Sequence, residues 1–191
     1  MQNSVITPDE SLLLIIDIQE RLCAAMDQAW LGRVIHYAGL MALFARLEGI
    51  PVIVTEQYPQ GLGGTHPDMV KRLAGVTHQN LAKTSFGCGG DAAIVNAIAK
   101  SGRKKIIVVG METHICTYLT VLDLCQRGYE VFMCVDATIA RGREHYDNGL
   151  ALMEQAGAFL TNTETLVFQM MGCSGGATFK AISSYLKQSA K

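Results

Sequence analysis

The sequence predicts an α/β protein, in which a mostly parallel β-sheet is covered by helices on both faces in a three-layer αβα arrangement. Short apolar runs rich in isoleucine and valine alternate with longer segments whose apolar residues recur at helical spacing. This alternation is typical of a parallel sheet that is buried on both sides. Of the 191 residues, 49% are hydrophobic and 17% are charged, so one sizeable core can form. We therefore expect a single domain over residues 1–191.

The first part of the chain contains two expected strands separated by a long helix. Ser11–Ile18 holds five consecutive apolar residues and is predicted as the first strand. Trp30–Glu48 carries a helical apolar stripe, which Gly49 and Pro51 would end. The second strand is expected over Pro51–Thr55. It is followed by a loop over Glu56–His66, a short helix over Pro67–Leu73 and a brief strand near Leu81 and Ala82.

The second half repeats the alternation of strands and helices. Asp91 can cap a helix that runs to about Lys100 and ends at Gly102. The further strands are expected over Lys105–Val109, Glu130–Val135 and Ala158–Thr161. The further helices are expected over about His114–Gln126, Glu144–Gln155, Thr163–Met170 and Ala177–Lys187.

Charge and hydropathy narrow the class of partner. The chain has 16 basic and 17 acidic residues, a formal net charge of −1, which gives no support to non-specific nucleic-acid binding. We expect a small-molecule substrate. The N-terminal residues lack a basic segment before an apolar stretch, and no run approaches the roughly 20 apolar residues of a membrane span. We expect a cytoplasmic protein that does not contact membranes.

The cysteine pattern does not resemble a secreted disulfide framework, because the six cysteines are scattered and form no CxxC pair. Five of them are expected to be packing residues. The six are Cys23, Cys88, Cys116, Cys125, Cys134 and Cys173.

Cys116 is the candidate nucleophile. It follows the apolar run that ends at Gly110, and Thr113 can cap the helix in which the cysteine would lie. A thiol near a helix N-terminus feels unpaired N–H groups and the positive end of the helix dipole, and both favour the reactive thiolate. The alternative is ordinary packing in the core, where free cysteines are common.

Asp17 and Lys83 can meet Cys116 at one edge of the sheet. All three follow predicted strands, and ligands of open parallel sheets bind outside the carboxyl ends of the strands. Each residue has a plainer interpretation. Asp17 could cap a helix, since Asp17-Ile18-Gln19-Glu20 has the spacing of a capping box. Lys83 could be a solvated loop charge.

Together these motifs resemble the isochorismatase-like cysteine hydrolases, which include nicotinamidases and carbamoyl-amide hydrolases such as N-carbamoylsarcosine amidase. The resemblance is carried by Asp17 after a hydrophobic strand, by Lys83-Thr84-Ser85-Phe86 and by Gly110–Cys116. Leu122-Asp123-Leu124, Val135-Asp136-Ala137, Arg141 and Ala156-Gly157-Ala158 extend it over nearly the whole chain. Glu56–Gly63 is similar to the branch of isochorismatase domain-containing proteins.

The resemblance implies a Rossmann-like sheet of about six strands and a catalytic triad of Asp17, Lys83 and Cys116. It also implies a cis peptide between Met111 and Glu112, and an oxyanion hole formed by the N–H groups of Glu112 and Cys116. Asp17 would accept the thiol proton, Lys83 would orient Asp17, and a Cys116 thioester would form and be hydrolysed.

Two departures from relatives narrow the chemistry. Nicotinamidases carry an Asp-x-His pair and a later histidine that bind a metal, whereas Thr55-Glu56-Gln57-Tyr58 stands at the corresponding strand end. His36, His66 and His78 are isolated, so no essential metal is expected. Enzymes of this family that cleave isochorismate, a vinyl ether, lack the nucleophilic cysteine, which points this chain to amide or carbamoyl substrates.

No cofactor is expected, because neither Gly61–Gly64 nor Gly87–Gly90 has the spacing of a phosphate-binding loop. Four residues that flank the triad could line a substrate pocket, or could simply be packing residues. They are Gln19, Tyr58, Phe86 and His114.

Two other functions remain open at this point. The chain could be a binding or scaffold protein that keeps the fold without activity. It could also be a redox-sensing thiol protein, with Cys88 as the resolving partner of Cys116. In keeping with the family, we expect a homo-oligomer, a dimer or larger.

Overall fold

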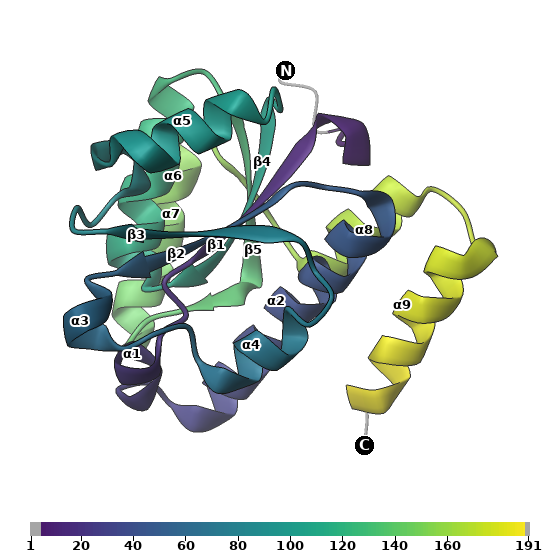
Figure 1. Ribbon diagram of the computed structural model, residues 1–191, viewed down its shortest axis with the longest axis horizontal. Coiled ribbons are helices and arrows are strands. Elements are labelled where there is room, and N and C mark those ends of the chain that lie inside the picture. Colours follow the sequence, from purple (N-terminus) through teal and green to yellow (C-terminus); the bar gives the residue numbers. More distant parts are fainter. Residues whose placement is uncertain (1–4, 190–191) are drawn as a thin grey trace.

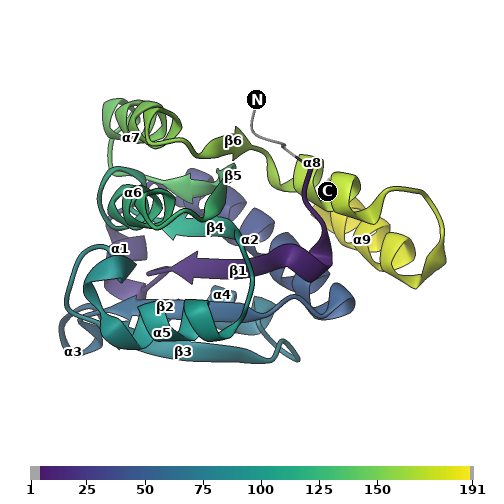
Figure 2. The same ribbon diagram turned by 90° about the horizontal axis from the view of Figure 1, so that it is seen from above.

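A computed structural model describes residues 5–189 (Figure 1). Within that range the chain forms one six-stranded sheet in the order β3-β2-β1-β4-β5-β6, which can be followed in Figure 2. Every pair of neighbouring strands is parallel. The predicted fold class is therefore confirmed. The strands are β1 (Ser11–Ile16), β2 (Val52–Gln57), β3 (His78–Lys83), β4 (Lys105–Met111), β5 (Glu130–Ile139) and β6 (Phe159–Thr161). Residues 1–4 and 190–191 of the expected domain lie outside the described range.

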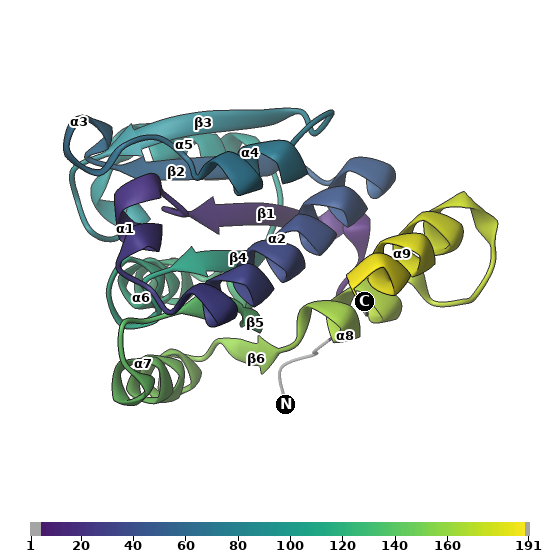
Figure 3. The ribbon, with the colours of Figure 1, turned by 90° about the horizontal axis from the view of Figure 1, so that it is seen from below.

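Helices cover both faces of the sheet (Figures 2 and 3). One face carries α5 (Ala92–Lys100), α6 (Tyr118–Gln126) and α7 (Arg143–Gln155). The other carries α2 (Gln28–Glu48), α4 (Pro67–Arg72) and α8 (Thr163–Met171), with α9 (Gly176–Ser189) packed outside α2. Two short helices, α1 (Glu20–Ala24) and α3 (Pro59–Leu62), lie beyond the carboxyl ends of the strands (Figure 3). Within residues 5–189 no helix is both long and apolar enough to span a membrane.

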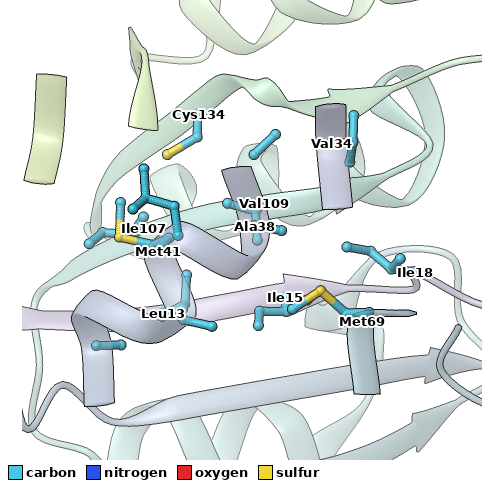
Figure 4. Close-up of a cluster of buried hydrophobic side chains, with 14 of the residues drawn as sticks. Leu13, Ile15, Ile18, Val34, Ala38, Met41, Met69, Ile107, Val109 and Cys134 are labelled. Carbon is cyan, nitrogen blue, oxygen red and sulfur yellow. The ribbon is translucent and has the colours of Figure 1, made fainter. Parts of the chain in front are cut away.

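The protein has one hydrophobic core on each face of the sheet. Strand β1 contributes to both, because alternate side chains of a strand point to opposite faces. Leu12 and Leu14 belong to the cluster beneath α5 and α6, whereas Leu13 and Ile15 belong to the cluster beneath α2. Figure 4 shows Leu13 and Ile15 within that second cluster. All six residues of β1 are buried, which explains why the strand reads as a continuous apolar run.

Several predicted boundaries are wrong in physically instructive ways. The predicted loop over Glu56–His66 contains the end of β2 and helix α3, and α1 was not predicted, because helices of four or five residues show no periodic signal. β3 extends over six residues rather than two. It is an edge strand whose first three side chains are exposed, so apolar alternation is missing. β5 continues to Ile139.

Two details concern individual residues. α2 begins at Gln28, two residues earlier than predicted, because the Asp27 carboxylate accepts a hydrogen bond from the Trp30 N–H at 2.8 Å. Cys173 is exposed, so it is not the packing residue that the sequence predicted.

The order of the strands places a topological switch point between β1 and β4. From β1 the chain adds β2 and β3 on one side, and it then returns to add β4, β5 and β6 on the other. The loops that follow β1 and β4 therefore diverge to opposite faces, and ligands of such sheets bind at this switch point. Asp17 and Cys116 follow these two strands.

Candidate active site

Three residues that are distant in the sequence meet at the carboxyl edge of the sheet. Asp17 directly follows β1, Lys83 is the last residue of β3, and Cys116 lies in the turn after β4. Lys83 Nζ lies 2.6 Å from Asp17 Oδ2, and both side chains are fully buried. The Asp17 carboxylate lies near the Cys116 thiol and, after burial, contributes most to raising its pKa. The structure thus brings together the nucleophile, base and cation expected from the sequence, and Lys83 is not a solvated loop charge.

Two residues of β2 complete the surroundings of this ion pair. Thr55 Oγ1 donates to Asp17 Oδ1 at 2.7 Å, and Gln57 Oε1 accepts from Lys83 Nζ at 2.7 Å. A buried ion pair is tolerated only when its remaining hydrogen-bonding capacity is satisfied. Neither side chain was predicted to have a role. The available signal was the run of three polar residues, Thr55, Glu56 and Gln57, that ends an apolar strand.

The backbone at Asp17 has a left-handed conformation, with φ of 49°. This conformation costs a residue with a side chain about 1–2 kcal/mol, although aspartate tolerates it better than most. Asp17 does not cap α1, whose N-cap is Gln19. The capping interpretation is therefore wrong, and the carboxylate is free to bond Lys83 and Thr55 close to Cys116.

Cys116 does not lie in the first turn of a regular α-helix. Residues Thr113–Thr117 form a wider π-helical turn, and α6 begins at Tyr118. Thr113 does not cap this turn, because its hydroxyl pairs with that of Thr138 on β5 at 2.9 Å. Turns of this kind are frequent at functional sites because they redirect a side chain within a helical segment.

The Cys116 thiol is protonated in the resting protein. Burial and the nearby Asp17 carboxylate raise its pKa to about 12, and Lys83 only partly opposes them. The expectation that the helix position favours the thiolate is therefore wrong: desolvation and an adjacent negative charge outweigh the dipole. Chemistry at this sulfur needs a base near the thiol, and Asp17 is a carboxylate close enough to raise the pKa of Cys116.

The segment that leads into the turn has an unusual backbone. The peptide bond between Met111 and Glu112 is cis. Gly110 has φ of 127°, and a Cβ atom there would collide with the backbone of Ile16 on β1, so the close approach of β4 requires glycine. The Glu112 carboxylate is buried and bonds Arg141 Nε at 2.9 Å.

Two of the four predicted pocket residues, Tyr58 and Phe86, adjoin Lys83. Tyr58 and Phe86 are exposed, and their backbones hold Lys83. Tyr58 N–H donates to the Lys83 carbonyl at 2.8 Å, and the Phe86 carbonyl accepts from Lys83 Nζ at 2.8 Å. His114 stacks on His145 with ring centroids 4.4 Å apart, and burial lowers the pKa of His114.

Gln19 has a different role from the one predicted. Its side chain is fully buried, its amide nitrogen donates to the carbonyls of Gln57 and Gly63, and its oxygen accepts from the Gln57 N–H at 2.7 Å. These bonds use the whole amide to join the start of α1 to the end of β2. Gln19 is therefore a structural residue rather than a pocket residue.

Over residues 5–189, no group of three or more histidine, cysteine, aspartate or glutamate side chains is placed to hold a metal ion. At the end of β2, where nicotinamidases place metal ligands, Gln57 instead bonds Lys83.

The fold and the site define a doubly wound α/β protein with a buried Asp–Lys pair and a cysteine at the switch point of its sheet. The isochorismatase domain family matches residues 11–165. The chain belongs to this family. Isochorismatase domain-containing protein 2A of Mus musculus is 34% identical over 188 residues, which cover 96% of this chain and 85% of that protein.

Solved structures agree with this assignment. The structure described as MAR1 ribonuclease from Caenorhabditis elegans has a TM-score of 0.88 and 32% identity, and the match covers 98% of this chain and 95% of that one. The YcaC gene product of Escherichia coli, described as an octameric hydrolase of unknown specificity, has a TM-score of 0.85 and 17% identity over 100% and 97% of the chains. The second similarity concerns the fold alone.

Proposed function

We propose that this isochorismatase-family protein is a metal-independent cysteine hydrolase that cleaves the C–N bond of a small amide or carbamoyl compound. The observation that supports this most directly is the buried Asp17–Lys83 pair, whose carboxylate lies near the Cys116 thiol. A carboxylate and an ammonium withdrawn from solvent beside a protonated thiol form the arrangement required to generate a nucleophile at the moment of attack.

In the first half of the reaction, Asp17 takes the proton of Cys116 as the sulfur adds to the carbonyl carbon. The N–H groups of Glu112 and Cys116 donate to the oxygen that becomes negative. The tetrahedral intermediate then collapses, the C–N bond breaks, and Asp17 passes its proton to the leaving nitrogen. Ammonia or an amine departs and a Cys116 thioester remains.

In the second half, Asp17 removes a proton from water as the water oxygen attacks the thioester carbon. The C–S bond breaks, the acid is released, and the proton on Asp17 returns to Cys116. Lys83 keeps its charge throughout. Its role is to hold Asp17 in place and to offset the carboxylate charge in a site that excludes water.

The test is a panel of primary amides, carbamoyl amides and small esters, assayed for released ammonia or acid. Cys116→Ala should abolish turnover and keep the melting temperature, whereas the half-buried Cys125→Ala should retain activity. An unchanged rate in Cys116→Ala would overturn the proposal.

Two alternatives are less well supported. A redox-sensing pair of Cys116 and Cys88 needs accessible thiolates, yet burial raises the pKa of Cys88 to about 11 and that of Cys116 to about 12. A scaffold protein has no need of a buried ion pair at its switch point. Stoichiometric labelling of Cys116 by an alkylating agent that is lost in Asp17→Asn favours the hydrolase, and labelling that does not depend on Asp17 favours the scaffold.

The ribonuclease description of the Caenorhabditis elegans structure suggests a further substrate class. The balance of 16 basic and 17 acidic residues does not favour binding of a polyanion, so we keep a small-molecule substrate as the proposal. Incubation with RNA serves as an additional arm of the panel. We further propose a homo-oligomer, a dimer or larger, since Tyr58 and Phe86 leave apolar surface exposed beside Lys83. We also propose a cytoplasmic location.

A further inference from the structure

The polar residues of β2 lie between the two strands that supply the ion pair. β2 pairs with β1 on one side and with β3 on the other. Thr55 and Gln57 are two residues apart, so their side chains point to the same face of the sheet. Both are buried. Thr55 therefore reaches Asp17 across one strand interval, and Gln57 reaches Lys83 across the other.

The Lys83 ammonium is fully used within the protein. An ammonium has three N–H donors, and Lys83 Nζ bonds Asp17 Oδ2 at 2.6 Å, Gln57 Oε1 at 2.7 Å and the Phe86 carbonyl at 2.8 Å, with the Ser85 carbonyl at 3.3 Å. No donor is left for a substrate. Lys83 therefore acts on the chemistry through Asp17, and whatever holds Lys83 also controls Asp17.

The orientation of the Gln57 amide is fixed by its other contacts. Its nitrogen donates to the Thr84 carbonyl at 2.9 Å, and its backbone N–H donates to Gln19 Oε1 at 2.7 Å. A flipped amide would point its N–H groups at the Lys83 ammonium and its oxygen at the Thr84 carbonyl, which removes both bonds. The oxygen therefore faces Lys83, and the amide acts as a neutral acceptor.

Thr55 contributes differently, because a hydroxyl can either donate or accept a hydrogen bond. It donates to the ionised Asp17 carboxylate at 2.7 Å. When Asp17 carries a proton, the same hydroxyl can remain bonded by accepting, whereas Lys83 can only donate.

We infer that Thr55 and Gln57 are positioning residues that hold the Asp17 carboxylate beside Cys116, Thr55 by bonding it directly and Gln57 by holding Lys83 against it. This inference rests on the proposed cysteine chemistry. Cys88 is a further titratable group beside these residues; burial raises its pKa to about 11, and the Thr120 and Thr55 side chains partly oppose this.

The test follows alkylation of Cys116 by iodoacetamide as a function of pH, with intact-mass detection, in Thr55→Val and Gln57→Glu. Thr55→Val removes a donor from the carboxylate. Gln57→Glu keeps an acceptor for Lys83 but adds a second carboxylate that shares its charge. In a plot of the alkylation rate of Cys116 against pH, the acidic limb is the range in which the rate falls as the pH is lowered. Both changes should move this limb to higher pH by about one unit.

Three further variants separate positioning from general damage. Thr55→Ser should keep the wild-type profile because it keeps the hydroxyl. Thr163→Val removes a bond of the same kind, from a fully buried threonine to Asp136 Oδ1 at 2.8 Å, and should leave the profile unchanged. Gln28→Glu is the corresponding control for Gln57→Glu, because the Gln28 amide donates to the Cys23 and Met26 carbonyls, away from the triad. It should also leave the profile unchanged.

The outcomes separate this inference from the proposed function. If Thr55→Val and Gln57→Glu are folded and their acidic limbs coincide with that of the wild type, the positioning role is wrong and the hydrolase proposal is unaffected. If Asp17→Asn leaves the alkylation of Cys116 unchanged at every pH, Asp17 does not act as its base and both are wrong. Shifted limbs together with no hydrolysis of any amide support positioning and contradict the assigned substrate class.

Discussion

Lys83 Nζ and Asp17 Oδ2 lie 2.6 Å apart, and neither side chain is accessible to solvent. Removing one partner of such a pair leaves an unpaired buried charge, whereas removing both does not. We expect Lys83→Met to lower the free energy of unfolding by about 3–5 kcal/mol, and Asp17→Asn/Lys83→Met to recover part of this loss. Urea unfolding of Lys83→Met, Asp17→Asn and the double variant measures both the loss of stability and its recovery. Equal stability of Lys83→Met and the wild type would contradict this account.

The raised pKa of Cys116 predicts a loss of stability at alkaline pH. The folded protein holds the thiol protonated up to a pKa of about 12, above the ordinary value of 9.0. The stabilisation is therefore complete below the unfolded pKa, and it is lost as the pH rises from there through the folded pKa. Each pH unit in that window contributes about 1.4 kcal/mol per thiol.

Unfolding curves measured across this window should thus fall less steeply for Cys116→Ala than for the wild type. Cys173→Ala, which alters an exposed cysteine, should follow the wild type. Parallel slopes for wild type and Cys116→Ala would show that burial does not hold the thiol protonated.

Gly110 should be intolerant of any side chain. Gly110→Ala places a methyl group against the Ile16 backbone at φ of 127°, so we expect a loss of at least about 3 kcal/mol. Gly128→Ala is the matched control, because φ is also positive there, at 82°, but no atom lies within 4 Å of the added Cβ. It should cost about 1–2 kcal/mol. Similar melting temperatures for both variants would contradict the close approach of β4 to β1.

The His114–His145 stack gives a spectroscopic prediction. Burial is the main cause of the lowered pKa of His114, and the neighbouring His145 lowers it further. His145→Ala removes the like charge and opens the ring to solvent, so both effects should raise the pKa of His114. Titration of its imidazole resonances by NMR measures the midpoint. A midpoint that falls in the variant would mean that His145 stabilises the charged form.

Metal removal should not affect turnover. Gln57 occupies the end of β2 and bonds Lys83, so we expect the hydrolysis rate to survive prolonged treatment with a chelator. Activity that is lost with the chelator and restored by zinc or manganese would identify a metal requirement.

The positions of Asp17, Lys83 and Cys116 could be predicted because residues that follow parallel strands gather at one edge. The protonation of Cys116 could not, since it depends on burial and on the distance to Asp17, whereas the sequence indicates only its position in a helical segment. Likewise, polar residues such as Thr55 and Gln57 carry no sign of their partners, which come from other strands. The extent of β3 was hidden because an edge strand need not alternate.

The position of β2 between β1 and β3 has a consequence for folding. Asp17 and Lys83 are 66 residues apart in the chain, and they can meet only after β2 has paired with both neighbours. Such pairings are non-local, and they form slowly compared with helices. During synthesis Cys116 is thus an ordinary thiol, and its special chemistry begins only when the sheet is complete.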